Sequence, residues 1–201
     1  GLRLERVLVD YDVNPDHNTY QSDGYSYTRP FPTVRLAWKL DDNHKLSLFL
    51  NRRVDRPNEV DIRIFPKYDE PELIKVGNPG LRPQFTTSTD LGYRMAWSGG
   101  SLYAAGYHRI VDATITRIAT QAPGSPLLYN VFQNAGRSRI TGSELVWQQT
   151  VSPAVSISAN ANLYRTSIGA FTVVNLYPVP VTYSAAKTSL TSGSLKVNAN
   201  L

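Results

Sequence analysis

Residues 155–163 read VSISANANL, and this stretch decides the fold class. Its odd positions are all apolar, whereas its even positions are all serine or asparagine. Such an alternation is typical of a β-strand that has one apolar and one polar face. It recurs in residues 34–40, 46–50, 91–97 and 195–201. We find no apolar stripe of helical period long enough to predict a helix, so the chain is predicted to be all-β.

The composition agrees with this fold class and excludes several functions. The 201 residues include 12 tyrosines, 13 glycines and 13 prolines, which favours strands joined by many turns. The absence of cysteine excludes a disulfide framework, a thiolate nucleophile and cysteine-bound metal clusters. The net charge of +5 is too small and too dispersed to predict nucleic acid as a partner. The chain also has no apolar run near the length of a membrane-spanning helix.

Eight strands are expected, connected by alternating short and long segments. The short connections, at 41–44, 98–100 and 150–153, permit only antiparallel neighbours. The long connections are approximately 14–27, 55–84, 119–130 and 169–182. Short turns on one rim and long loops on the other predict an antiparallel up-and-down meander that is a section of a transmembrane β-barrel. The expected strands are 1–13, 28–40, 45–54, 85–97, 101–118, 131–149, 154–168 and 183–201.

The three tryptophans each come just before a short connection, at Trp38, Trp97 and Trp147. We therefore expect them at one rim, where aromatic side chains gather at a membrane interface. The alternative is that they close the open end of a soluble β-protein core.

The acidic clusters match no complete catalytic or metal-binding motif. Residues 10–16, DYDVNPD, have the oxygen spacing of a calcium loop, but Pro15 and Gln21 stand where an EF-hand requires Gly and Glu. Asp69, Glu70 and Glu72 could pair for glycoside hydrolysis, although solvated loop charge is the simpler interpretation. The three histidines are scattered, and no nucleotide-binding or hydrolase motif is present. We predict no enzymatic activity, no metal and no cofactor.

The longest connection, from about Val54 to Pro83, is the predicted ligand-binding segment. Loops of this length in a compact protein are usually functional or disordered. Its aromatic and charged residues stand between prolines, which lower the entropy lost when a loop closes on a ligand. The arginines before it could attract an anionic nutrient complex, whereas the alternative is a loop that merely seals the mouth. The candidate ligand-binding residues are Arg52, Arg53, Arg56, Tyr68, Asp69, Glu70 and Glu72.

Two stretches carry a family resemblance. Residues 50–93 contain Arg-Arg-x-x-Arg-Pro, then Gly-Asn-Pro-x-Leu-x-Pro and a strand with Leu-Gly-Tyr, and residues 134–145 read NAGRSRITGSEL. Both stretches resemble the C-terminal barrel of TonB-dependent outer-membrane receptors, especially the outer-membrane β-barrel family common in Bacteroidetes-type bacteria. Gln84 departs from the Glu usual in that family. The motif residues, which we expect to be structural, are Asn78, Pro79, Leu81, Pro83, Gly92, Asn134, Gly136, Gly142 and Glu144.

These motif residues have plausible physical roles. Pro79 and Pro83 are expected to stiffen a loop that turns back into the barrel wall. Gly92 and Gly142 suit places where a strand bends or a neighbour approaches closely.

The resemblance implies a function in nutrient uptake. Members of the family are similar to plugged barrels that import iron chelates, vitamins or oligomers with energy relayed by the TonB complex. It implies a bacterial outer-membrane location, with outer-membrane lipid and an imported small molecule or oligomer as partners. Residues 1–201 are interpreted as a partial barrel domain of a longer protein, with TonB contacted only through a plug domain outside these residues. Two alternatives are a barrel of the same family with a surface-assembly role and a soluble β-sandwich that binds carbohydrate.

Overall fold

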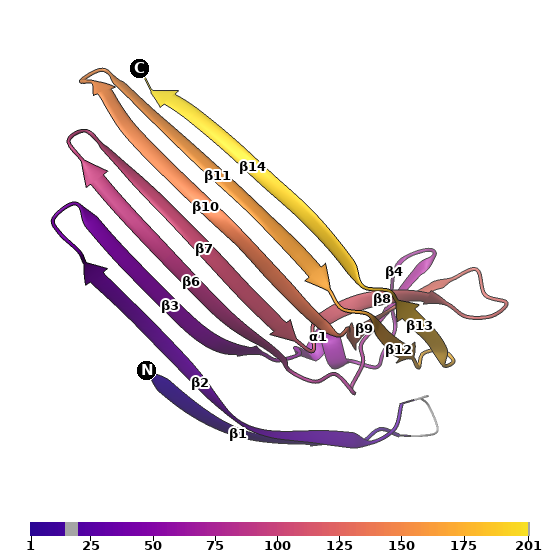
Figure 1. Ribbon diagram of the computed structural model, residues 1–201. Helices are drawn as coiled ribbons and strands as arrows, with labels where there is room; N and C mark the ends of the chain where they lie inside the picture. The colour runs from indigo at the N-terminus through magenta and orange to yellow at the C-terminus, as the bar shows by residue number, and fades with distance from the viewer. Residues whose placement is uncertain (15–19, 201) are drawn as a thin grey trace.

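The computed structural model describes residues 1–14 and 20–200. Its largest part is an antiparallel sheet of eight long strands, which we call the wall (Figure 1). Successive wall strands are neighbours in space, so the predicted meander is confirmed. In spatial order they are β1 (Leu2–Tyr11), β2 (Asp23–Lys39), β3 (His44–Asp55), β6 (Gln84–Trp97), β7 (Gly100–Asp112), β10 (Arg137–Ser152), β11 (Val155–Ile168) and β14 (Thr188–Asn200).

The three predicted hairpins are present. β2 pairs with β3, β6 with β7 and β10 with β11, each antiparallel, across connections at 40–43, 98–99 and 153–154. The outermost strands β1 and β14 each have one partner among the described strands, so the wall is an open sheet and not a closed barrel. No helix in the described part of the chain is long and apolar enough to cross a membrane.

The strand register divides the wall into an apolar and a polar face. Leu36, Leu48 and Leu91 form one cross-strand row on the apolar face. On the polar face, Glu144 lies opposite Asn162. The apolar face is uncovered in the described structure, as the 72% exposure of Leu195 illustrates. A soluble β-sandwich would bury such residues against a second sheet, so that alternative does not fit this architecture.

The tryptophans occupy one end of the apolar face, as predicted. The ladders place Trp38, Trp147 and Trp97 in three successive cross-strand rows beside the short turns. They therefore share one rim, which is opposite the long connections in Figure 1.

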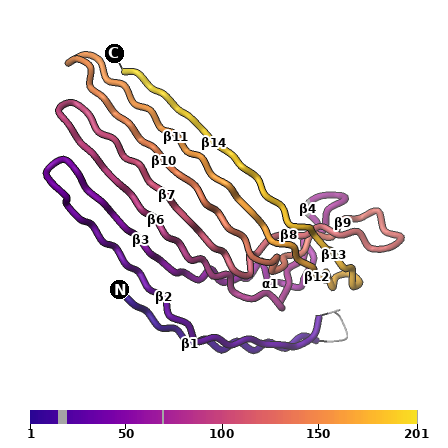
Figure 2. Tube along the Cα trace, in the orientation of Figure 1, coloured from indigo at the N-terminus to yellow at the C-terminus, as the bar shows by residue number. Residues whose placement is uncertain are grey.

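Three of the four expected long connections form a second structure, which we call the loop layer (residues 56–83, 113–136 and 169–187). Of the fourth, expected at 14–27, the last residues belong to β2, which begins at Asp23, and residues 15–19 lie outside the described part of the chain. The loop layer gathers at the end of the wall opposite the short turns (Figures 1 and 2). A four-stranded sheet has the order β4-β5-β9-β8, in which β5 and β9 are parallel, and β12 and β13 form a hairpin. The elements are α1 (Glu59–Ile62), β4 (Lys67–Glu70), β5 (Leu73–Val76), β8 (Ile115–Gln121), β9 (Leu128–Asn134), β12 (Phe171–Asn175) and β13 (Val181–Ala185).

A cluster of buried apolar side chains lies in the loop layer. Ile74, Val76, Ala122, Tyr129 and Val131 pack together. The three connections of the loop layer therefore form a folded unit with its own core.

Three predicted strands are interrupted where the wall meets the loop layer. The expected strand 101–118 breaks at Ala113, whose φ is 55°, and the expected strand 131–149 breaks at Gly136, whose φ is 54°. The expected strand 183–201 divides at residues 186–187. At the first two breaks the predicted continuous strands were wrong because the chain changes direction through a positive φ at a single residue, which the residue pattern does not reveal.

Candidate ligand-binding site

The motif residues Asn134 and Gly136 form one of these kinks. Gly136 adopts the left-handed conformation that residues with a Cβ disfavour, and its carbonyl oxygen accepts a hydrogen bond from the Thr114 N–H at 3.2 Å. Asn134 Nδ2 donates to the carbonyl oxygens of Ala113 and Arg82, at 3.0 and 2.9 Å. Asn134 Oδ1 accepts from the Arg82 N–H at 2.8 Å. The motif therefore fixes the direction in which the loop layer leaves the wall.

A buried chain of amide side chains joins parts of the loop layer that are distant in sequence. Asn78 Nδ2 donates to the Phe132 carbonyl oxygen at 3.0 Å and to Gln133 Oε1 at 3.3 Å. Gln133 Nε2 donates to Asn175 Oδ1 at 2.7 Å, and Asn175 Nδ2 donates to the Ile118 carbonyl oxygen at 3.0 Å. Asn175 is 0% exposed, and leaving such a buried polar group unpaired costs about 1–3 kcal/mol. This amide chain therefore holds the loop layer in one arrangement.

The Asn-Pro motif makes a tight, buried turn. The Leu81 N–H donates to the Asn78 carbonyl oxygen at 3.2 Å, and the Leu81 side chain is 1% exposed. Pro79 is the second residue of this turn and Pro83 follows it just before β6, which agrees with the expected stiffening of the return to the wall.

The wall glycines of the motif lie beneath tyrosine rings on the polar face. A Cβ built on Gly142 would lie 2.5 Å from Tyr107 Cζ, and one on Gly92 would lie 2.7 Å from Tyr103 Oη. The predicted close approach of a neighbour is therefore present at both positions. Glu144 is exposed on the same face.

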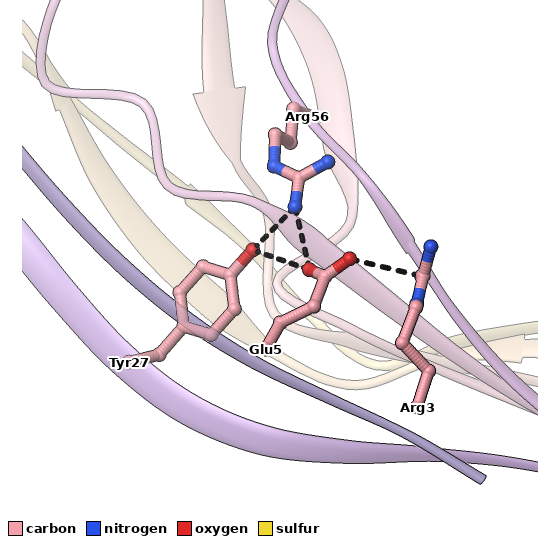
Figure 3. Close-up of polar contacts among 4 residues, drawn as sticks. All are labelled: Arg3, Glu5, Tyr27 and Arg56. Carbon is pink, nitrogen blue, oxygen red and sulfur yellow. Dashed lines mark hydrogen bonds and ion pairs between the residues drawn. The ribbon is translucent and has the colours of Figure 1, made fainter.

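Arg56, one of the three predicted arginines, contacts the ribbon formed by β1 and the first half of β2. Arg56 Nη2 donates to Glu5 Oε2 at 2.6 Å and to Tyr27 Oη at 3.0 Å, and Arg3 pairs with the same Glu5 at 3.1 Å (Figure 3). The hydrogen bond that the Arg56 guanidinium donates to Tyr27 and the charge of Glu5 raise the pKa of this guanidinium. These contacts join the ribbon to the residues that follow β3.

The other two arginines make separate contacts. The Arg52 guanidinium lies 5.9 Å from the centroid of the Phe85 ring, and Arg53 pairs with Asp55 at 3.4 Å. Each predicted arginine therefore has a structural contact, and a ligand role for them stays a prediction.

The remaining predicted residues belong to the β4–β5 hairpin. Tyr68 is 68% exposed and hydrogen-bonds Tyr177, while Glu70 pairs with Lys75 at 3.1 Å. Glu72 is exposed, and Asp69 is a residue of β4. Among the described contacts none joins this hairpin to the three arginines, so the predicted ligand residues form two groups.

Next to the hairpin, the structure has a pocket of about 310 Å³ whose lining carries four cations and no acidic residue. Most of the lining comes from the predicted ligand-binding segment, and the rest comes from β8 and β9. The lining includes Arg63, Lys67, Lys75, Arg117, Asn130 and Phe132. Such a concave, positively charged site at the mouth is suited to an anionic ligand.

Backbone hydrogen bonds hold the wall of the pocket in place. The Gly77 N–H donates to the Arg63 carbonyl oxygen at 2.8 Å, and the Asn78 N–H donates to the Asp61 carbonyl oxygen at 2.7 Å. Tyr20 Oη donates to the Gly77 carbonyl oxygen at 3.1 Å, and burial raises the pKa of this tyrosine. Helix α1 is thus fixed to the strand end that forms the other side of the pocket.

The open wall, the kinked strands and the folded loop layer define an outer-membrane barrel with a structured mouth. The model of the outer membrane protein beta-barrel family matches residues 1–201, so the chain belongs to this family and is a bacterial outer-membrane protein. The family resemblance of the sequence motifs is thereby confirmed, and the soluble β-sandwich is wrong. Among curated proteins, none matches this sequence.

Solved structures share the fold at low sequence identity. The siderophore receptor PirA from Pseudomonas aeruginosa is 14% identical over 98% of this chain and 41% of that chain, with a TM-score of 0.59. The copper transporter OprC is 16% identical over 98% of this chain and 36% of that one, with a TM-score of 0.55. The Q482A mutant of the ferric enterobactin receptor PfeA from Pseudomonas aeruginosa, in complex with enterobactin, is 10% identical over 86% of this chain and 34% of that chain, with a TM-score of 0.52. The present chain therefore spans less than half the length of each.

Sequence reasoning missed Arg117, Asn130 and Phe132 as pocket residues. Arg117 was expected within a long strand, and Asn130 within a loop. The parallel pairing of β5 with β9 brings these three residues next to the β4–β5 hairpin. No sequence pattern predicts a parallel pair between such short strands. In the described residues no group of three acidic or histidine side chains could hold a metal.

Proposed function

We propose that this chain is part of an outer-membrane receptor barrel that takes up a nutrient, and that the ligand is first captured in the loop layer. The observation that carries the proposal is the pocket, in which Arg63, Lys67, Lys75 and Arg117 surround a space of about 310 Å³. A preformed cationic pocket concentrates anionic ligands at the mouth before they enter the barrel.

The similar structures support this class of function. They are a siderophore receptor, a ferric enterobactin receptor and a copper transporter, so an iron chelate is the favoured ligand, ahead of a vitamin or an oligomer. The protein has no enzymatic role in this proposal. The apolar face of the wall contacts outer-membrane lipid, and energy from the TonB complex reaches the barrel through a plug domain of the longer protein.

The test uses the full-length receptor in cells that depend on limiting iron chelate. Lys67→Ala combined with Lys75→Ala is expected to lower uptake at least tenfold while the receptor remains inserted. Lys39→Ala combined with Lys45→Ala removes the same charge at the short-turn end of the wall and serves as the control. Deletion of residues 66–76 should lower uptake at least as much as the Lys67→Ala, Lys75→Ala double substitution. Normal uptake by the inserted deletion variant would refute capture by this segment.

A further inference from the structure

Arginines on the apolar face of the wall gather at one end of it. Because side chains alternate along a strand, Arg139 lies on the same face as Trp147, and Arg165 lies on the same face as Leu163. Both arginines are exposed, and both stand at the loop-layer ends of β10 and β11 (Figure 1). At the short-turn end, the described residues on this face of β7, β10, β11 and β14 include no charged side chain.

Arg139 and Arg165 have no carboxylate partner among the described contacts. The neighbouring Arg137 pairs with Asp112, which is the one acidic residue described on this face of β7, β10, β11 and β14. Arg165 Nη2 donates to Ser189 Oγ at 3.2 Å, so its one described hydrogen bond goes to a neutral group. The loop-layer end of the apolar face therefore keeps two uncompensated positive charges.

The two guanidinium groups can reach one ligand. Arg165 is paired with Thr141 across the β10–β11 ladder, so Arg139 is its diagonal neighbour on the same face. Diagonal neighbours of a sheet lie about 7–8 Å apart, which is within reach of long side chains that close on one anion. A guanidinium matches phosphate in particular, because its parallel N–H groups bind two phosphate oxygens at once.

The position of these arginines along the wall matches a membrane interface. Arg139 is eight positions from Trp147 on β10, which corresponds to about 26 Å along a strand. In a barrel whose strands are tilted by about 40°, this distance spans about 20 Å of membrane thickness, and the apolar band is about 25 Å tall. With the tryptophan rim at one interface, Arg139 lies near the other interface. Long loops of such barrels are extracellular, so this is the interface of the outer leaflet.

A groove next to the arginines opens on the same apolar face. It has a volume of about 550 Å³. Leu163 lines it and is two positions from Arg165 on β11, so the groove ends one cross-strand row from the arginines. Small side chains between leucines leave room for a hydrocarbon chain, which makes more contacts there than on a flat surface. The apolar lining consists of Ala104, Leu145, Ala161, Leu163, Gly193 and Leu195.

We propose that this site binds a phosphorylated lipid of the outer leaflet, with an acyl chain in the groove and a phosphate between Arg139 and Arg165. The combination favours a lipid, because a free anion would satisfy the arginines and leave the groove unfilled. The inference rests on the lipid contact of the wall proposed above and is independent of nutrient capture in the loop layer.

The test is native mass spectrometry of the detergent-solubilised full-length receptor. It is titrated with diphosphoryl lipid A and with the same lipid after removal of both phosphates. The phosphorylated lipid is expected to bind at least tenfold more tightly. Inorganic phosphate in large excess should not displace it, since phosphate alone makes no contact with the groove. Equal affinities for the two lipids, or displacement by inorganic phosphate, would overturn the inference.

A charge variant tests the phosphate contact. Arg139→Gln combined with Arg165→Gln should lower the affinity for diphosphoryl lipid A at least tenfold and leave the dephosphorylated lipid unaffected. Arg94→Gln combined with Arg109→Gln is the matched control, because it removes the same charge from the polar face of the wall. An equal loss of affinity in the two double variants would show that general electrostatic attraction, and not this site, holds the lipid.

A second variant tests the groove. Ala161→Leu fills the groove and should weaken the binding of both lipids, whereas Ala159→Leu lies outside its lining and should weaken neither. Unchanged binding by the Ala161 variant would refute the acyl-chain contact. Lipid binding is measured on purified protein and nutrient capture by uptake in cells, so failure of one is distinguishable from failure of the other.

Discussion

In the wall, Leu163 and Leu195 expose 58% and 72% of their surfaces, whereas in the loop layer Val131 exposes none. Both regions are built from antiparallel hairpins, yet the wall has an uncovered apolar face and the loop layer buries its apolar side chains internally. The wall therefore needs an apolar environment outside the protein, whereas the apolar side chains of the loop layer pack against one another. A mouth with a core can hold a pocket in one shape, which an irregular loop cannot do without an entropic cost.

The largest effect is expected from removing a buried side chain of the loop layer. Leu81→Ala should destabilise the layer by about 2–5 kcal/mol, because the side chain is buried and a cavity remains. Hydrogen exchange in the detergent-solubilised full-length receptor should show faster exchange in β5, β8 and β9. Equally accelerated exchange in β10 and β11 would show that the two regions do not fold as separate units.

A charge on the apolar face tests whether the wall needs its apolar surrounding. Leu91 lies in the next cross-strand row inward from that of Trp38. Leu91→Lys should destabilise the bilayer-inserted receptor by about 1–3 kcal/mol, between the costs of a lysine facing lipid at the interface and at the midplane. Urea unfolding from lipid vesicles gives the free energy. Ser194→Lys, on the polar face, is the control and should have little effect. The proposed lipid contact is wrong if both lysines cost the same.

The glycines beneath tyrosine rings test packing inside the wall. Gly142→Ala should cost about 1–3 kcal/mol, because the new Cβ would lie 2.5 Å from the Tyr107 ring. Gly106→Ala is a matched control on the neighbouring strand, where a Cβ meets nothing within 4 Å. Urea unfolding of the two variants compares them directly, and equal stabilities would contradict the packing role.

The smallest effect is expected at a surface ion pair of the short-turn end. Asp42→Asn removes the partner of Lys39, but the Asp42 side chain is 93% exposed and no measurable change in unfolding is expected. Asp41→Ala should cost about 0.5–1.5 kcal/mol by the same measurement, because Asp41 Oδ1 accepts the N–H groups of Asn43 and His44. If Asp42→Asn were the costlier change, turn geometry would not be what stabilises this hairpin.

The wall could be predicted from the sequence because alternation and short connections both act locally. The stretch around residues 155–163 defines its two faces, and a turn as short as residues 98–99 leaves one pairing for the strands beside it. The motif glycines were also predictable, since a missing side chain implies a close neighbour.

The loop layer could not be predicted in the same way. Its β5–β9 pairing joins residues more than fifty positions apart, and its kinks depend on backbone angles at Ala113 and Gly136. The ligand segment was identified by length, but the pocket cation Arg117 comes from a different part of the chain. Spatial neighbours from distant segments require the tertiary structure.

The side-by-side kinks at Ala113 and Gly136 have a consequence for how such receptors diverge. The Ala135 N–H donates to the Thr114 carbonyl oxygen at 2.7 Å, so the two strand pairs change direction together at one boundary. Beyond that boundary, substitutions alter the pocket without shifting the register of the wall. Residues 56–83 and 113–136 can therefore vary together as one unit while the pairing of the wall strands is kept.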